Sequence, residues 1–306
     1  MQLLKKYWWI VLGMLFLVMY LTTNKPKDQK NSVQVPEKSL QSGIVKKDVF
    51  PETLKTIEKV NWGNSLETSF PEKLPKLIAT RKIIDSEKEN KIKNYFGGEG
   101  TNLYIQKELS YIQYSDMPEN PQNLPITASW DENKLKSKLK KIVSDLNEEN
   151  NMNIEWINAG YRKYVQPYML EAGADEAQFM EITGDYIIEG MRSTTFHGEA
   201  IRAFFDGEGN LLKLSLYLKP DIGLGEGSWQ IMSLEEAKNS PISNFRAGVN
   251  DLYNQIETVN ANRVKLVNIF SNEKNTIKPF FIFEGSTYSE HDKKPVNINV
   301  LLEATR

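Results

Sequence analysis

One long apolar run near the start of the chain constrains its organisation more than any other feature. Residues 7–21 read YWWIVLGMLFLVMYL and contain no charged side chain. As a helix, this run at about 1.5 Å per residue would reach about 22 Å, short of a hydrocarbon core of about 30 Å. A few flanking residues make it long enough to span, with Trp8 and Trp9 at one membrane interface and Tyr20 at the other. The run therefore predicts a transmembrane signal anchor over residues 7–23.

Two alternatives to an anchor remain open, a cleaved signal peptide and a buried helix. A cleavage site needs small residues in an A-x-A-like arrangement, and the run ends instead in Leu21-Thr22-Thr23-Asn24. Lysines flank both ends, so the positive-inside rule gives little contrast. The simplest topology leaves residues 1–6 in the cytoplasm and the remainder outside the cell membrane, as a single-pass protein with an extracytoplasmic C-terminal region.

Composition excludes several classes of protein and site. The net charge is -2 and 25% of the residues are charged, so no basic surface predicts nucleic-acid binding. The chain has no cysteine, which excludes disulfides, cysteine-zinc sites and thiol catalysis. We expect a polar linker over 24–65 and a folded extracytoplasmic region over 66–306, with a possible sub-boundary near 150–185.

Four helices are predicted from capping boxes and apolar spacing. Ser86, Ser129 and Ser233 each precede a glutamate by three residues, which is the pattern of a capped helix start. Behind the second box, apolar residues recur at spacings of four, three and four at Leu135, Leu139, Ile142 and Leu146. The same spacing predicts a long helix through Phe245, Val249, Leu252, Ile256 and Val259.

Strand patterns fill most of the remaining chain. The segment LLKLSLYL (211–218) alternates leucines with other residues after the turn at 206–210, and it predicts the second strand of an antiparallel hairpin. Further strands are predicted at 103–114, 185–191, 195–205, 263–270, 279–284 and 296–302. The expected class is α+β, with antiparallel sheets and packed helices behind one N-terminal transmembrane helix. The recurring order of helix and strands is compatible with two related units.

The most promising binding element is a glycine-rich segment. Gly223, Gly225 and Gly227 lack the third glycine of a dinucleotide fingerprint and the Gly-Lys-Ser/Thr of a phosphate loop. We expect a surface loop here. With Trp229 beside it and Tyr217 before it, this loop is the candidate binding site.

No residue pattern identifies a catalytic, cofactor or metal site. His197 and His291, the two histidines, have no metal-site spacing. Asp206, Glu208 and Asn210 imitate the start of a calcium loop, but Tyr217 stands where the bidentate glutamate belongs.

Two further patterns in the sequence partly match those of enzymes. Ser137 and Lys140 match a serine–lysine pair on the charged side of a helix, and no Lys-Thr-Gly follows. Several glutamates could supply an acid and a base for glycoside hydrolysis, although their spacing selects no pair: Glu181, Glu189, Glu199, Glu226, Glu284 and Glu303.

The layout resembles the YycH/YycI group. The points of similarity are the apolar N-terminal run, the hairpin AIRAFFDGEGNLLKLSLYL, the following SLEEA helix, and the closing strands PFFIFEG and PVNINVLLEA. The resemblance covers about 66–304 loosely. It implies a single-pass extracytoplasmic protein that regulates a bacterial cell-wall sensor kinase through membrane and domain contacts. The group has no catalytic motif, so no functional residue is carried over.

The sequence therefore favours a membrane-anchored, extracytoplasmic, non-catalytic protein that binds a protein or envelope component. Regulation of a membrane sensor or envelope process is one role open to such a protein. Its expected partners are the membrane, through the N-terminal helix, and a membrane or envelope protein. The alternatives are an envelope hydrolase with a carboxylate pair, and a module that binds polysaccharide or peptide through aromatic side chains near Tyr217 and Trp229.

Overall fold

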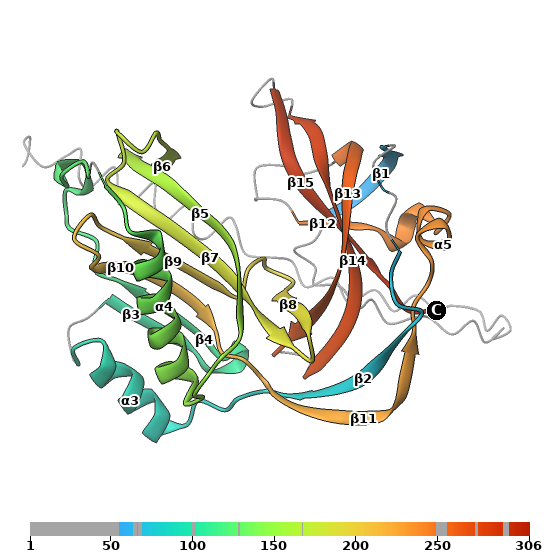
Figure 1. Ribbon diagram of the computed structural model, residues 1–306, viewed down its shortest axis with the longest axis horizontal. Helices are drawn as coiled ribbons and strands as arrows, with labels where there is room; N and C mark the ends of the chain where they lie inside the picture. Colours follow the sequence, from blue (N-terminus) through green and yellow to red (C-terminus); the bar gives the residue numbers. More distant parts are fainter. Residues whose placement is uncertain are drawn as a thin grey trace, which may run out of the picture. The chain divides into compact units, whose positions relative to one another are not determined.

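The computed structural model describes residues 55–306, apart from gaps at 64–65, 67–68, 99–101, 128, 167, 249–255, 273–274 and 290–293. The described chain forms fifteen strands, β1–β15, and three α-helices, α3–α5 (Figure 1). Thirteen strands join one mixed sheet, and the other two form a separate ribbon. The predicted α+β class with packed helices is therefore wrong, because the described part is mainly β-sheet.

The membrane prediction also needs correction. The described residues contain no helix that is long and apolar enough to cross a membrane. The transmembrane, single-pass and signal-anchor predictions, and the membrane localisation that followed from them, therefore have no support in the described part of the chain. The predicted segment 7–23, with Trp8, Trp9 and Tyr20, lies outside the described residues.

Seven antiparallel strands form the first section of the large sheet. In spatial order they are β6 (Tyr168–Glu171), β5 (Ile154–Val165), β7 (Phe179–Ile188), β9 (Ile201–Phe205), β10 (Leu211–Tyr217), β4 (Tyr111–Ser115) and β3 (Asn102–Gln106). The predicted strand 103–114 is thus two strands, β3 and β4, joined by the 3-10 turn η1 (Lys107–Leu109). A second 3-10 turn, η2 (Pro121–Asn123), follows β4.

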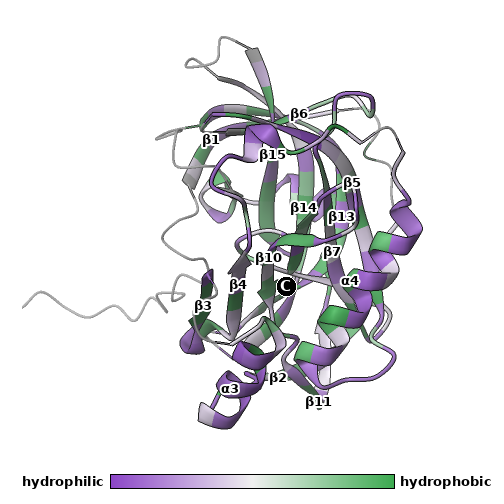
Figure 2. Cartoon of the chain, turned by 90° about the vertical axis from the view of Figure 1, so that its left-hand side faces the viewer, coloured by the Kyte–Doolittle hydropathy of each residue, from purple (hydrophilic) through white to green (hydrophobic). Residues whose placement is uncertain are grey.

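Two helices pack against this section of the sheet. They are α3 (Ser86–Tyr95) and α4 (Glu132–Asn147), with Asp85 and Asp131 as N-caps in place of the predicted serines. The four apolar residues predicted for α4 are all buried and pack against the sheet. In Figure 2, α3 is mostly hydrophilic, whereas α4 carries hydrophobic residues among hydrophilic ones. The amphipathic pattern of α4 is therefore confirmed.

The predicted hairpin is also confirmed. It consists of β9, the turn at 206–210 and β10, and the four alternating leucines of 211–218 are buried. Asp206 Oδ1 accepts the backbone N–H groups of Glu208 and Asn210 at 3.0 and 2.7 Å, which closes the turn. This use of Asp206 agrees with a turn and not a calcium loop.

The second section of the sheet is a closed ring of five hydrogen-bonded strands. Its members are β1 (Lys55–Trp62), β12 (Arg246–Gly248), β15 (Lys294–Glu303), β14 (Thr276–Ser289) and β13 (Ile256–Ser271). The ring closes because β1 pairs with both β12 and β13. Strand β8 (Met191–Thr195) links the sections by pairing with β7 and β13. β1 lies within the range that the sequence assigned to a linker, 24–65.

The position of β14 in the ring explains why its sequence contains a continuous apolar run. In β14, Phe281 and Phe283 belong to the main core of the ring, with Phe245, Val259 and other residues. The alternate residues of the strand, Phe280 and Ile282, join a smaller cluster on the other side. A strand buried on both faces reads as a continuous apolar run, which is why PFFIF predicts its strand correctly. The other two closing strands, 263–270 and 296–302, are confirmed within β13 and β15.

The helix predicted through Phe245 and Val259 is wrong in its described part. Residues 246–248 form β12, and β13 begins at Ile256. Positions 249 and 252 of that prediction lie outside the described residues. The predicted capping box at Ser233 is confirmed, but it opens only the five-residue helix α5 (Leu234–Lys238), which a 3-10 turn, η3 (Ile242–Asn244), follows.

Each section has its own hydrophobic core. The first draws mainly on residues between Leu77 and Leu218, and the second on Ile57 and residues from Ile231 onward. The change from one core to the other falls between Leu218 and Ile231. This position is C-terminal to the sub-boundary that the sequence suggested near 150–185.

Candidate functional site

The glycine-rich segment is not a loop. It forms strand β11 (Asp221–Gln230), which pairs antiparallel with β2 (Lys73–Thr80) in a two-stranded ribbon (Figure 1). The register shifts between Leu224 and Ser228, where β11 bulges. The prediction of a loop fails because glycine disfavours strands locally, while the pairing with β2, far away in the sequence, decides the conformation.

The three glycines of β11 differ in whether the structure requires a glycine at their positions. Gly227 has a φ of +78°, a left-handed conformation that favours glycine. A Cβ on Gly225 would lie 3.3 Å from side-chain atoms of Ile78 and Lys76, tighter than an ordinary contact. A Cβ on Gly223 would meet nothing within 4 Å, and its φ is not left-handed. Neither packing nor backbone conformation within the described residues therefore requires glycine at 223.

Large apolar side chains are exposed on and beside the ribbon. Leu224, which follows Gly223 on β11, is 72% exposed, and Ile78, which pairs with Gly223 from β2, is 56% exposed. Ile83, just beyond the end of β2, is 70% exposed. Single exposed apolar residues are common, but three near one short ribbon are typical of an interaction surface.

The rest of the ribbon is anchored in the two cores. Leu77 and Ala79 are buried in the core of the first section, and Leu74 packs against the core of the ring. Trp229 also packs against the ring, and the ammonium groups of Lys76 and Lys278 lie 5.0 and 5.8 Å from its ring centroid. Trp229 is thus part of the ribbon's attachment rather than an exposed platform.

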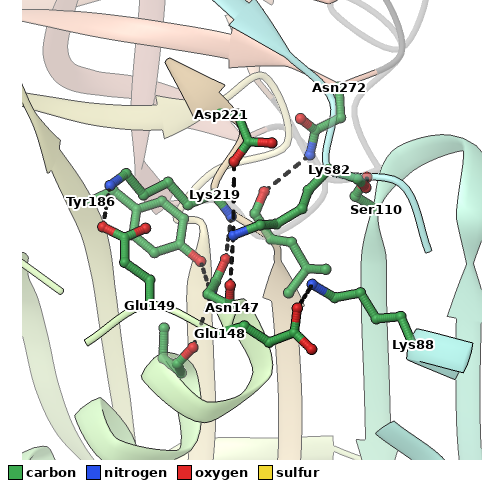
Figure 3. A network of polar contacts seen from close by, with 12 residues as sticks. Lys82, Lys88, Ser110, Asn147, Glu148, Glu149, Tyr186, Lys219, Asp221 and Asn272 are labelled. Atoms are coloured by element: carbon green, nitrogen blue, oxygen red, sulfur yellow. Dashed lines mark hydrogen bonds and ion pairs between the residues drawn. The ribbon is translucent and has the colours of Figure 1, made fainter. Parts of the chain in front are cut away.

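A network of polar contacts fixes the other end of the ribbon (Figure 3). Asn147, fully buried at the end of α4, accepts the backbone N–H of Lys219 at 2.8 Å through Oδ1. Lys82 Nζ donates to the Asn147 carbonyl and lies 3.9 Å from Asp221. Burial lowers the pKa of Lys82, and the neighbouring charge of Lys88 adds to this effect. The network therefore holds the first residues of β11 and the end of β2 against α4.

Buried tyrosine and asparagine side chains extend this network. Tyr186, fully buried, donates its hydroxyl to the Tyr217 carbonyl at 2.7 Å, and burial raises the pKa of Tyr186. Asn272 Nδ2 donates to the carbonyls of Leu109 and Leu218 at 3.0 and 3.2 Å. These residues cannot be identified from the sequence, because no local pattern distinguishes a buried asparagine from a surface one.

The structure does not bring the two predicted aromatic residues into one site. The Tyr217 ring contacts Tyr111 and His197, with ring centroids 4.7 and 6.0 Å away. No described contact links Tyr217 with Trp229, and the three glycines lie on the ribbon. The predicted loop site therefore separates into a ribbon and an aromatic surface at the end of β10.

The carboxylates considered for hydrolysis are mostly engaged in ion pairs. Glu181 lies between Arg162 and Arg202, and Glu199 shares Arg202, with N–O distances of 2.5, 3.3 and 3.4 Å. Glu284 pairs with Lys265, and Glu303 pairs with Lys278. The remaining two, Glu189 and Glu226, are exposed.

Two cavities are described on the surface, and neither is lined by any of these six glutamates. The residues that the structure describes contain no group of three or more histidines, aspartates and glutamates that could hold a metal ion. His197 is exposed between β8 and β9, while His291 lies outside the described residues. The carboxylate-pair alternative thus gains no geometric support from these six residues.

Comparison with known proteins identifies no family. No family model matches the chain, and no curated protein matches it. Among solved structures, the chain is similar to an uncharacterized protein from Eubacterium rectale ATCC 33656. The TM-score is 0.39 and the sequence identity is 9%, over 82% of this chain and 89% of that chain. None of these comparisons tests the resemblance to the YycH/YycI group, which stays a prediction.

Proposed function

We propose that this chain is a non-catalytic binding protein, and that its β2–β11 ribbon binds an extended segment of a protein partner. The partner segment adds as a third strand along β11. The observation that carries this proposal is the exposed, bare surface of β11, where Leu224 and Ile78 flank a glycine at 223 that the described structure does not require. Glycine in a strand often marks a place where another backbone approaches closely.

The backbone of β11 supports the proposal. Within the described ribbon, β11 pairs with β2 on one edge, and an edge strand presents N–H and C=O groups that can pair with an added strand. Near the end of β11 this pairing already occurs, because the Arg306 N–H donates to the Gln230 carbonyl at 3.0 Å and Ile231 bridges Thr305. The stretch 221–228 is therefore the part of this edge that an added strand can extend.

The side chains favour β11 over β2 as the receiving strand. Proteins protect edge strands with proline and lysine. β2 carries Lys73, Pro75 and Lys76, whereas 221–228 reads DIGLGEGS and contains neither residue type. The register pairs Gly223 with Ile78 and Leu224 with Leu77, so Ile78 and Leu224 lie on opposite faces of the ribbon. A partner strand that pairs its backbone with β11 would cover Leu224 with the apolar side chains of one face and reach over Gly223 toward Ile78 with those of the other.

Site-specific photo-cross-linking in the native host tests this function. A photo-reactive amino acid at position 224 is expected to give one discrete, protease-sensitive adduct, whose cross-linked peptide maps to a single segment of the partner. The matched control is position 126, since Ile126 is 59% exposed but lies outside the ribbon. Equal adducts from both positions, or adducts scattered over many proteins, would contradict the proposal.

Substitutions on the ribbon should separate binding from folding. Leu224→Asp is expected to weaken binding of the cross-linked segment by about tenfold or more, because a carboxylate would replace the apolar contact. Stability should change by no more than about 0.5 kcal/mol, since the side chain is exposed. Gly223→Tyr should have the same two effects, because its Cβ enters open space. Ile126→Asp serves as the control, and binding should be unaffected by it.

A further inference from the structure

A second site lies apart from the ribbon, at a small cavity between the end of β13 and the loop after β8. Its walls include the aromatic side chains of Phe196, Tyr217 and Phe270, with His197 at the surface and Asn272 from the end of β13. The cavity has a volume of about 20 Å³, which is room for one water molecule or one hydroxyl group. It is therefore suited to one small polar group at the tip of a larger ligand.

Asn272 leaves a hydrogen-bond acceptor without a donor at this cavity. The residue is only 5% exposed, and its Nδ2 is fully used by the Leu109 and Leu218 carbonyls. Its Oδ1 is buried and has no hydrogen-bond partner among the residues that the structure describes. A buried acceptor of this kind costs free energy until a donor reaches it. An O–H or N–H donor that enters the cavity, from water or from a ligand, would satisfy this acceptor.

Aromatic rings continue from the cavity onto the surface. The His197 ring is stacked on the Tyr217 ring at 6.0 Å with an interplanar angle of 9°, and the Tyr111 ring lies 4.7 Å from the Tyr217 ring. Burial raises the pKa of Tyr217 to about 12, so its hydroxyl stays protonated near neutral pH. Gln113 is exposed on β4 and lies two residues beyond Tyr111, on the same face of the sheet.

The residues that line the cavity restrict the class of ligand that it can bind. The residues that line the cavity include no carboxylate, so a buried ammonium group would have no counter-charge there. An anion would meet the unpartnered oxygen of Asn272 and find repulsion in place of a donor. A neutral molecule with hydroxyl donors and an apolar face satisfies both the Asn272 acceptor and the aromatic rings.

We infer that this surface binds a saccharide. One sugar hydroxyl donates to Asn272 Oδ1, and the apolar face of the ring stacks on Tyr217 beside His197. No bond is made or broken, so the site is one of recognition only. This inference is independent of the ribbon, since it uses different residues and a different surface.

The test begins with the full-length protein on an array of hexose and N-acetylhexosamine oligomers, followed by calorimetric titration with the strongest binder. Tyr217→Ala is expected to weaken that binding by about threefold to tenfold, in line with the loss of one aromatic contact. Tyr217→Phe keeps the ring and should retain most of the affinity. His197→Ala, at an exposed position, should also reduce binding.

Two controls make the outcome decisive. Tyr288→Ala removes an exposed tyrosine from β14 and should leave the affinity unchanged. Melting temperatures of all variants show whether a loss of binding reflects unfolding. Two results would overturn the inference. In the first, the protein binds no array compound more strongly than Tyr217→Ala does. In the second, a high-resolution crystal structure obtained after soaking with the array compounds shows a fully hydrogen-bonded water on Asn272 and no sugar.

Discussion

Replacing Phe283 by alanine is expected to lower the free energy of unfolding by about 3–5 kcal/mol. Phe283 is fully buried inside the five-strand ring, where its ring centroid lies 4.9 Å from that of Trp62 and 6.0 Å from that of Phe245. Truncation would remove these contacts and leave a cavity that a closed ring of strands can fill only in part. Denaturant unfolding of the two proteins measures the difference.

The control for Phe283→Ala lies in the same strand. Tyr288 is exposed, so Tyr288→Ala should change stability by no more than about 0.5 kcal/mol. The contrast between the two variants tests whether one side of β14 faces a closed core. A loss of less than about 1 kcal/mol for Phe283→Ala would show that this core is open or readily rearranged.

The second large effect is expected at the polar network beside the ribbon. Asn147→Ala should lower the free energy of unfolding by about 2–3 kcal/mol, because it removes a fully buried side chain and leaves the partly buried Lys219 N–H without its acceptor. It also removes the side-chain hydrogen bond from Asn147 Nδ2 to the Val143 carbonyl, at 2.9 Å. Denaturant unfolding gives the energy, and amide hydrogen exchange shows whether the first residues of β11 open more often.

Asn133 provides the control for Asn147 on the same helix. It is exposed near the start of α4, so Asn133→Ala should leave stability unchanged or raise it slightly, as alanine favours a helix. If Asn147→Ala behaved like Asn133→Ala, the network would not hold the ribbon. If the network holds the ribbon, Asn147→Ala should speed amide exchange only near Lys219 and leave exchange in the ring unchanged.

Sequence reasoning succeeds where the determining interactions are local. The spacing of Leu135, Leu139, Ile142 and Leu146 specifies the buried side of α4 within one helix, and the alternating leucines of β10 do the same within one hairpin. Both patterns depend on neighbours only a few residues away. Their elements are therefore predicted correctly without knowledge of the tertiary structure.

The helix predicted through Ile256 and Val259 shows where local patterns fail. A spacing of three residues is typical of a helix, but it also occurs in a strand whose two faces are both buried. Ile256 and Val259 lie on β13, where both are buried in the core of the ring and pair with Ile57 and Val60 of β1. The pairing with β1 joins residues about two hundred positions apart, and no local signal carries it.

The candidate sites were predicted only in part. The sequence singled out Gly223 and Tyr217, but it placed them in one loop with Trp229. The alternation in KLPKLIAT, residues 73–80, is the signal that could have identified the partner strand of β11. Nothing in the sequence distinguishes Asn147 and Asn272, because their importance comes from tertiary burial and from the backbone groups that they meet.

Strand addition to β11 is tested most directly by amide hydrogen exchange, with and without the partner segment found by cross-linking at position 224. If a third strand is added, alternate amides of residues 221–228 should become strongly protected on binding, while the amides of β2 that already pair with β11 should change little. Binding that leaves the exchange of 221–228 unchanged would contradict strand addition and place the partner elsewhere on the molecule.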